Sequence, residues 1–269
     1  MPELPEVETI KRGIEIINNL QIKQVFRSEK KLRIDSMCDF SLLKEQKINK
    51  IKRRARYIIC ELSNDKSLII HLGMTGRLTI GNFKKKPHDH FACQFSNDKW
   101  LIFNDARRFG FIDLIDNDKL QSHQFLHKLG PEPLSNEFNT EYLLTKIKNK
   151  KMNIKTSLMD NSLVVGVGNI YANESLFDCQ ISPQKPAYQL TKKQANNIVK
   201  SVKKIIQQAI NLGGSSISDY VSATEEYGNF QNNFKVYGRH DRDCLKCKEV
   251  IARIIQNGRS TFFCPKCQK

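Results

Sequence analysis

Long apolar runs are missing from this sequence of 269 residues. No stretch approaches the roughly 20 apolar residues that a membrane-spanning helix needs. The first residues include Glu3, Glu6 and Glu8, where a secretory signal peptide would have a basic start followed by an apolar segment. We therefore expect a soluble, intracellular protein without a membrane partner.

Acidic residues are scarce relative to basic ones. The chain has 28 Asp and Glu against 44 Lys and Arg, which gives a formal net charge of +16. Two clusters, at 50–56 and 146–155, contain several basic residues and no acid. One such run can be a solvated helix face, but separate runs in one chain favour a polyanion. The charge therefore predicts binding to nucleic acid.

Cysteines are isolated over most of the chain and paired only at its end. The isolated ones have apolar or mixed neighbours and are expected to be unreactive: Cys38, Cys60, Cys93 and Cys179. The others form two Cys-x-x-Cys pairs: Cys244, Cys247, Cys264 and Cys267. Their spacing suits one tetrahedral zinc. Two disulfides are the alternative, which a reducing intracellular address disfavours.

The segment between the cysteine pairs has the pattern of a β-hairpin. Asn257-Gly258 is a turn signal, and the run 261–263 is rich in β-prone residues. The metal would fix a short ribbon that presents Arg253 and Arg259, a shape and charge that fit a DNA groove.

Hydrophobic periodicity divides the rest of the chain. Apolar residues recur at helical spacing behind Pro5, which predicts a helix from about 4 to 19. Short strand-like runs with turns between them then predict a β-sandwich or barrel-like first domain. These runs are 56–62, 67–72, 77–80, 90–95 and 100–103.

A Pro/Gly segment at 129–134 is typical of an interdomain linker, and an α-helical domain is expected over about 135–225. Thr191 and Gln194 form a capping box before an apolar stripe, and Gly213-Gly214 ends that helix. The stretch 215–233 is polar enough to be a loop, and it is where we expect base choice to be determined.

The N-terminus offers a nucleophile beside an acid. If Met1 is removed, Pro2 presents an α-amine with a pKa of about 8, against about 10.4 for lysine, so it is the better nucleophile at neutral pH. Glu3 is then placed for general acid–base work. The alternative is that Pro and Glu are ordinary residues of a first helical turn.

Seven motifs together resemble the bacterial formamidopyrimidine-DNA glycosylase family, and they extend from residue 1 to the end of the chain. They are the opening MPELPEVET, HLGMTG at 71–76, RRFG at 107–110, LGPEPL at 129–134, LMDN at 158–161, VVGVGNIY at 164–171 and the terminal cysteine pairs. The related endonuclease VIII branch typically has Gly where this chain has Leu4, so the resemblance favours oxidised purines as substrates.

The resemblance implies an α+β multidomain protein. Its parts would be an N-terminal helix with a β-sandwich (1–130), a helix–two-turn–helix domain (131–232) and a zinc β-ribbon (233–269). It also implies one structural zinc, no organic cofactor, a monomer, and a bacterial cytoplasmic enzyme at the nucleoid that acts on damaged double-stranded DNA.

The implied activity is that of a bifunctional glycosylase and abasic-site lyase for 8-oxoguanine and formamidopyrimidines. Pro2 would form a Schiff base, Glu3 would donate a proton with support from Glu6, and β,δ-elimination would cut the strand. Arg259 matches the family residue implicated in the δ step.

The remaining family positions are implied to contact DNA. Met74, Arg107 and Phe109 match the side chains that fill the void left by the extruded nucleotide, although Met and Phe are more often core residues. His88 matches a DNA-contacting histidine rather than a metal ligand. The other matches are to phosphate contacts: Lys150, Lys155 and Asn169.

Two positions depart from the family pattern. Arg56 stands where the family usually has Lys, so we expect it to bind DNA and not to transfer protons. Ala106 replaces a Pro before the paired arginines, which is expected to loosen that loop. Two rival functions remain, an oxidised-pyrimidine glycosylase and a non-catalytic zinc-ribbon DNA-binding protein.

Overall fold

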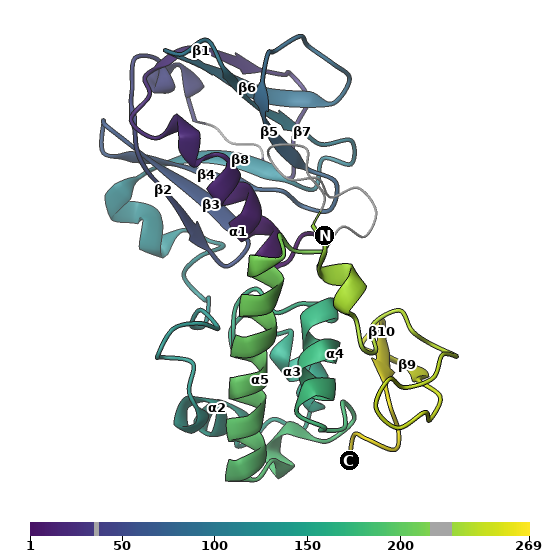
Figure 1. The fold of residues 1–269 in the computed structure, drawn as a ribbon. Coiled ribbons are helices and arrows are strands. Elements are labelled where there is room, and N and C mark those ends of the chain that lie inside the picture. Colours follow the sequence, from purple (N-terminus) through teal and green to yellow (C-terminus); the bar gives the residue numbers. More distant parts are fainter. Residues whose placement is uncertain (35–37, 216–227) are drawn as a thin grey trace. The chain divides into compact units, whose positions relative to one another are not determined.

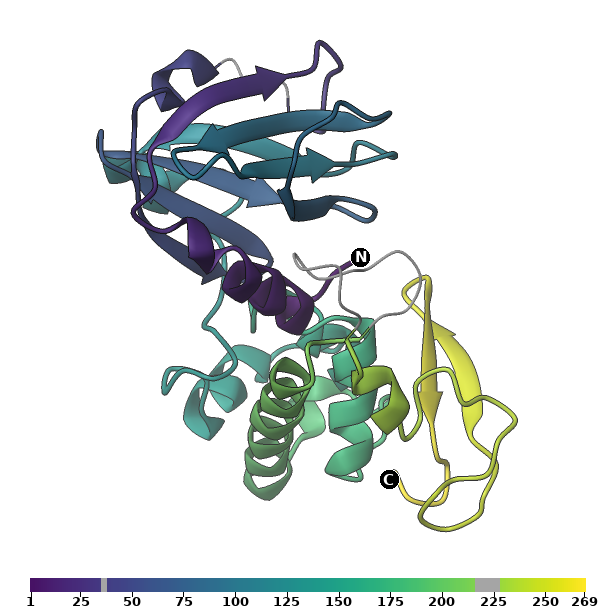
Figure 2. The same ribbon diagram turned by 45° about the horizontal axis from the view of Figure 1, so that its top comes forward.

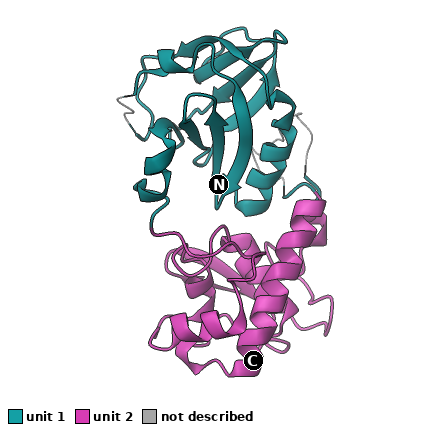
Figure 3. Cartoon of the chain, turned by 90° about the vertical axis from the view of Figure 1, so that its left-hand side faces the viewer, with its two compact units in different colours: residues 1–127, 213–229 teal, residues 128–212, 230–269 magenta. Residues whose placement is uncertain are grey.

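The computed structural model describes residues 1–34, 38–215 and 228–269. The chain forms two compact units (Figure 3), each built from two segments. Unit 1 comprises residues 1–127 and 213–229, and unit 2 comprises residues 128–212 and 230–269.

Unit 1 contains two four-stranded sheets in which every pairing is antiparallel (Figures 1 and 2). One has the order β1-β6-β7-β5, with β1 Ile22–Arg27, β5 Arg77–Gly81, β6 Asp89–Phe95 and β7 Trp100–Asn104. The other has the order β2-β3-β4-β8, with β2 Ile48–Arg54, β3 Tyr57–Leu62, β4 Lys66–His71 and β8 Phe111–Asp116. Apolar side chains from both sheets join one core. The predicted sandwich is confirmed.

The first helix, α1, spans Leu4–Gly13 and contacts β2 and β3. Its apolar stripe, which includes Val7 and Ile10, is buried in the sandwich core. The helix was predicted to reach about residue 19, but it ends at Gly13. A 3-10 turn, Glu15–Ile17, continues the chain and keeps Ile17 in the same core. The apolar residues of the stripe thus stay buried although a 3-10 turn replaces the last part of the predicted α-helix.

The five predicted strands are present with ends shifted by one residue at most, whereas β1, β2 and β8 were not predicted. In β2, Ile48 and Ile51 are buried and the residues between them are exposed. Five of the seven residues of this strand are polar or basic, so its pattern was interpreted only as a basic cluster. Pairing with β3 along its whole length stabilises it as a strand.

Unit 2 contains four helices among the residues that the structure describes: α2 Thr140–Ile147, α3 Ile154–Leu158, α4 Asn169–Asp178 and α5 Lys192–Asn211. The capping box that begins α5 is confirmed, because the Thr191 hydroxyl accepts a hydrogen bond from Gln194 N at 3.2 Å and Gln194 Oε1 accepts one from Thr191 N. Gly213 follows the helix with φ +76°, the left-handed conformation that glycine adopts without strain. Short 3-10 turns complete the two units: Phe40–Leu43, Asn117–Ser122, Ala187–Gln189 and Phe230–Asn233.

The hairpin predicted near the C-terminus is also confirmed. Strands β9, Ala252–Gln256, and β10, Arg259–Phe263, are antiparallel, with Gln256 opposite Arg259. The two residues between them, Asn257 and Gly258, both have positive φ, as a type I′ turn requires. Arg259 is therefore exposed at the tip of the ribbon.

Over the residues that the structure describes, no helix has the length and apolar character needed to cross a bilayer. Most of the loop expected at 215–233 lies outside the described residues, which include only its two ends.

Candidate functional site

The first turn of α1 is held by a buried carboxylate. Glu6 is 2% exposed, and its Oε2 accepts a hydrogen bond from Glu3 N at 2.8 Å. Its Oε1 accepts bonds from Ser215 N at 2.8 Å and from Ser215 Oγ at 3.1 Å. Glu6 thus ties the start of the chain to residue 215, far along the sequence. Glu3, itself buried, lies at the N-cap of α1, and Pro2 precedes it partly exposed.

Glycine makes this close approach possible. A Cβ atom on Gly214 would lie 2.9 Å from Glu6 Oε1, and one on Gly228 would lie 2.4 Å from Gly214 O. An isolated bridge also joins Ser215 to Asn229. Both ends of the segment that we expect to determine base choice are therefore fixed beside the first turn of α1, while its residues 216–227 lie outside the described part of the chain.

Arg56 also lies at the N-terminus. It occupies the two-residue turn between β2 and β3, where Ala55 has φ +53°. Its Nη1 is 3.8 Å from the sulfur of Met1. The turn thus brings a guanidinium to the residue that precedes Pro2.

His71 is a neighbour of Arg56 to which the sequence assigned no role. Its ring lies 5.0 Å from that of Tyr57 and stacks on Phe111 at 5.4 Å between centroids. Burial lowers the pKa of His71 to about 4, and the positive charge of Arg56 adds to the effect. The ring is thus neutral near pH 7. Its Nδ1 accepts from Gly73 N at 3.2 Å, which leaves the proton on Nε2.

Two loops present the three side chains expected to fill a void in DNA. Met74 is 42% exposed and Phe109 44% exposed, so neither is a core residue. The guanidinium carbon of Arg107 lies over the Phe109 ring, 4.7 Å from its centroid. The loops approach backbone to backbone, because a Cβ on Gly73 would lie 2.4 Å from Gly110 N.

Asp105 joins these two loops, and sequence reasoning missed its role. The carboxylate is fully buried and accepts hydrogen bonds from Thr75 Oγ1 at 2.5 Å, Arg107 N at 3.3 Å and Gly110 N at 2.8 Å. Three converging donors hold the loop that contains Ala106. The signal was an isolated Asp before the paired arginines, which resembled an ordinary turn residue.

His88 lies in an exposed turn next to these loops. It has φ +70°, and its carbonyl oxygen accepts from Asp105 N at 2.9 Å. Within the described residues, the four cysteines near the C-terminus are the single set of three or more His, Cys, Asp or Glu placed to share a metal ion, and His88 is not among them.

The phosphate contacts expected in unit 2 have different environments. Lys150 Nζ lies 2.6 Å from Asp160 Oδ2, and its side chain is one-third exposed. Lys155, in α3, is fully buried. Asn169 begins α4, and its Nδ2 donates to Ser260 O at 3.0 Å, so part of its hydrogen-bonding capacity is used by the zinc ribbon. Arg259 is exposed.

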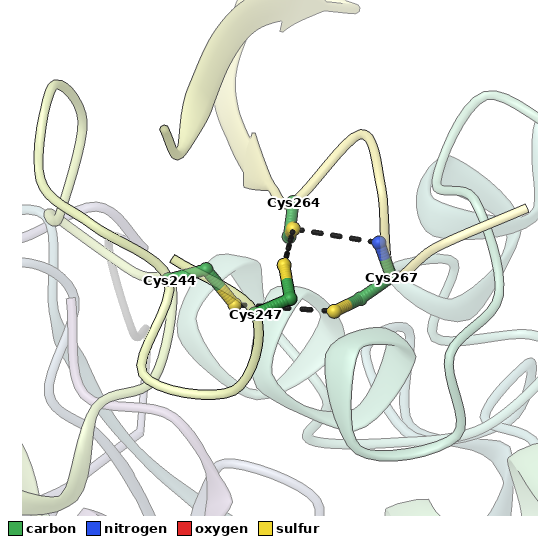
Figure 4. A group of neighbouring side chains, drawn as sticks. All are labelled: Cys244, Cys247, Cys264 and Cys267. Atoms are coloured by element: carbon green, nitrogen blue, oxygen red, sulfur yellow. Dashed lines mark hydrogen bonds between the residues drawn. The ribbon is translucent and has the colours of Figure 1, made fainter. Parts of the chain in front are cut away.

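The four cysteines of the ribbon converge (Figure 4). Their sulfur atoms all lie within 4.8 Å of one another, and Cys247 Sγ is 3.4 Å from Cys264 Sγ. Tetrahedral zinc with Zn–S bonds of about 2.3 Å separates its sulfur ligands by about 3.8 Å, so the set fits the ion. Backbone N–H groups of Lys246 and Cys267 point at Cys244 and Cys264 sulfur at 3.4 Å.

Comparisons with known proteins agree along the whole chain. The formamidopyrimidine-DNA glycosylase N-terminal domain matches residues 1–112, the H2TH domain of these enzymes matches 129–221, and a zinc finger found in FPG and IleRS matches 244–269. A formamidopyrimidine-DNA glycosylase of Rickettsia conorii is 41% identical over 276 residues, covering 100% of this chain and 99% of the relative. This chain belongs to the formamidopyrimidine-DNA glycosylase family.

Other members agree in sequence and structure. The Wolbachia pipientis enzyme from Culex pipiens is 44% identical, with both chains fully covered. A Lactococcus lactis Fpg variant bound to DNA containing Fapy-dG is 36% identical with a TM-score of 0.91, again with both chains fully covered. The Thermus thermophilus MutM (Fpg) protein is 34% identical with a TM-score of 0.89, covering 99% of this chain and 98% of that one.

Family membership confirms the predicted class of protein. The chain is a glycosylase of base excision repair with an N-terminal domain, a helix–two-turn–helix domain and a C-terminal zinc finger, and Cys244, Cys247, Cys264 and Cys267 form its structural zinc site. The predicted domain boundaries and the roles of individual catalytic and DNA-contacting residues stay predictions.

The zinc site yields a first prediction. The apolar cluster around it is small: among the described residues, Val236 and Ile251 are buried beside two of the cysteines and Phe177 and Phe262 pack against them, so the metal must supply much of its stability. Metal analysis should find one zinc per chain. Cys247→Ser should lose it and weaken binding to damaged duplex by about tenfold or more, the effect of losing one or two charge-assisted contacts, while unit 1 stays folded.

Cys179→Ser is the matched control, because this thiol also lies in unit 2 but is not one of the four converging cysteines, and burial raises its pKa to about 12. It should keep both zinc and DNA binding. Full binding by metal-free Cys247→Ser would contradict the role given to the zinc.

The depressed pKa of His71 yields a second prediction. Its pKa is about 4 in the folded protein and near 6.5 in the unfolded chain. The neutral ring therefore contributes stability in full above pH 6.5, and the contribution is lost as pH falls towards 4. It amounts to at most about 3 kcal/mol. His71→Gln should lose less unfolding free energy than the wild type between pH 7 and 4. Parallel losses in urea titrations would contradict the assignment.

Proposed function

We propose that this glycosylase is bifunctional, removing oxidised purines through a Schiff base on Pro2 and then cutting the strand as an abasic-site lyase. The observation that supports it most is the arrangement around the N-terminus. Glu3 is buried at the N-cap of α1, Glu6 holds its backbone, and Arg56 supplies a fixed positive charge beside Met1. Once Met1 is removed, the amine of Pro2 lies next to this acid, and Arg56 supplies a cation at the same end of unit 1.

Removal of Met1 frees the secondary amine of Pro2, which is the nucleophile of the reaction. The secondary amine of Pro2 attacks C1′ of the damaged nucleotide, the bond from C1′ to the base breaks, and the base leaves with the proton that the amine loses. Glu3 protonates the ring oxygen as the sugar opens, which leaves a positively charged imine between Pro2 and C1′. Burial of Glu3 next to the amine favours this assignment, because the acid is within one residue of the reacting nitrogen.

The imine allows the bonds from the sugar to its 3′ and 5′ phosphates to break in turn. It acidifies C2′, so loss of a C2′ proton expels the 3′ phosphate, and loss of a C4′ proton from the conjugated product then expels the 5′ phosphate. We assign to Arg259 the stabilisation of the second departing phosphate, since its guanidinium is exposed at the ribbon tip and always charged. The zinc supports that ribbon and takes no part in the steps.

Substrate access requires an extruded nucleotide and a filled void. The exposure of Met74 and Phe109, with Arg107 stacked on the latter, supports their insertion into the duplex. His88, Lys150 and Asn169 are proposed as contacts to the surrounding DNA. Because Lys155 is fully buried, we propose that it contacts a phosphate only in a conformation that exposes its amine.

Two observations favour oxidised purines. Leu4 distinguishes the chain from the endonuclease VIII pattern. Structural neighbours have also been solved with the relevant lesions, one on DNA containing Fapy-dG and a MutM on DNA containing carbocyclic 8-oxo-G, the latter with a TM-score of 0.89 and 36% identity.

A blocked N-terminus tests the proposal. Protein with an uncleaved N-terminal tag should still bind a duplex containing 8-oxoguanine, because the DNA contacts are unchanged, but it should lose strand cleavage and borohydride trapping. The same protein after precise removal of the tag and Met1 is the control. Equal trapping with and without the tag would rule out the amine of Pro2. Binding without any cleavage by the untagged protein would favour a non-catalytic ribbon protein.

Arg56 provides the next prediction. A guanidinium donates hydrogen bonds but does not act as a general base, so Arg56→Ala should weaken binding and slow every step together. Arg56→Lys should keep most activity with no new ionisation in the pH–rate profile. A several-fold rise in lyase turnover with a new pH limb in Arg56→Lys would instead assign proton transfer to this position.

A further inference from the structure

Helix α4 and strand β10 of the zinc ribbon are joined by side-chain amides within unit 2. Asn169 Nδ2 donates to Ser260 O at 3.0 Å, and Asn173 Oδ1 accepts from Phe262 N at 2.8 Å. The two asparagines are four residues apart on one face of α4, so they lie one above the other. Asn173 is 1% exposed, and its own Nδ2 donates to Asn169 O at 2.6 Å.

These amides form hydrogen bonds with outward N–H and C=O groups of β10, which in a larger sheet would pair with a third strand. In an antiparallel pair, alternate residues direct their N–H and C=O groups to the partner strand and the others direct them outward. Ser260 and Phe262 alternate with Thr261, and their outward groups bond to α4 instead of to a strand. The helix therefore fixes both the position and the register of β10.

A second anchor holds the segment that leads into the ribbon. Glu174 is 2% exposed, and its carboxylate accepts hydrogen bonds from Lys235 N at 2.9 Å, Val236 N at 3.0 Å and Tyr237 N at 2.8 Å. The Tyr237 ring then meets Phe262 of β10 edge-on, with 5.2 Å between centroids. Glu174 thus holds the segment whose Tyr237 ring packs on Phe262, and through that ring it supports β10.

We propose that Asn173 and Glu174 are positioning residues that hold Arg259 where it can assist the second elimination, and so set the proportion of β,δ to β product. This inference rests on the role proposed for Arg259. Phe262 is three residues from Arg259, a separation of about 10 Å along a strand. Tilting β10 at Phe262 therefore moves the guanidinium, whereas the amine and acid of unit 1 are untouched.

A displacement of about 1 Å at a reacting group is enough to slow a step by up to about a hundredfold. Base removal, trapping and β-elimination use Pro2 and Glu3, so they should change little. Only the δ step should slow, and the product ratio reports it without reference to how much enzyme is active.

The experiment uses the full-length zinc-loaded protein and an end-labelled duplex with one 8-oxoguanine. Asn173→Ala and Glu174→Ala each remove one anchor, and Glu174→Gln keeps one oxygen for the Val236 and Tyr237 N–H groups. Arg259→Ala is the benchmark. Ser201→Ala is the matched control, because it loses a buried hydrogen bond to the same helix, from Ser201 Oγ to Ser175 O at 2.8 Å, without contacting the ribbon. Zinc content, borohydride trapping and the δ-to-β product ratio are measured for each.

Asn173→Ala and Glu174→Ala should lower the δ-to-β ratio about tenfold, with trapping within about twofold of the wild type and one zinc retained. Glu174→Gln should fall between them and the wild type, and Ser201→Ala should match the wild type. If Glu174→Ala fails to hold zinc, Asn173→Ala decides, since it removes less. An unchanged ratio in Asn173→Ala while Arg259→Ala lowers it would overturn this inference alone. An unchanged ratio in Arg259→Ala would overturn the role proposed for Arg259 as well.

Discussion

The buried carboxylate of Glu6 is the contact on which the proposed chemistry most depends. It satisfies the N–H of Glu3 at the start of α1 and the N–H and hydroxyl of Ser215, and it is almost completely shielded from water. A carboxylate removed from water needs such donors, because its desolvation is costly otherwise. One side chain therefore determines where the N-terminal amine lies and where the segment after residue 215 begins.

The same device recurs at the other functional elements. Asp105 gathers the loops that present Met74 and Phe109, and Glu174 gathers three N–H groups before the zinc ribbon. In each case a buried acid binds the irregular backbone that regular secondary structure leaves unsatisfied. In this strongly basic chain, with a formal net charge of +16, these three acids lie inside and hold loops.

Much of the fold could be predicted from local patterns. The zinc site followed from cysteine spacing, the type I′ turn from Asn257-Gly258, and α5 from its capping box. The strand β2 could not be predicted, because only Ile48 and Ile51 mark its buried face and pairing with β3 is a non-local effect. The early end of α1 at Gly13 was missed because a 3-10 turn buries the same apolar positions.

The candidate site was predicted less completely than the fold. Motifs indicated Pro2, Glu3 and the void-filling side chains, but only the structure reveals that Met74 and Phe109 are exposed and that Asp105 joins their loops. The buried aromatic environment of His71 could not be predicted either, because it arises from the pairing of strands β3, β4 and β8. Long-range contacts that combine single polar residues leave no periodic signal in a sequence.

The proposed chemistry requires that the N-terminal proline carry the sugar during the reaction. Borohydride reduction of the enzyme with a duplex containing 8-oxoguanine, followed by proteolysis and mass spectrometry of the DNA-linked peptide, locates the bond directly. A covalent intermediate on Pro2 should yield one modified peptide, which begins at Pro2 and carries the sugar remnant on its α-nitrogen. A remnant on a lysine side chain, or no covalent adduct while the base is still released, would contradict it.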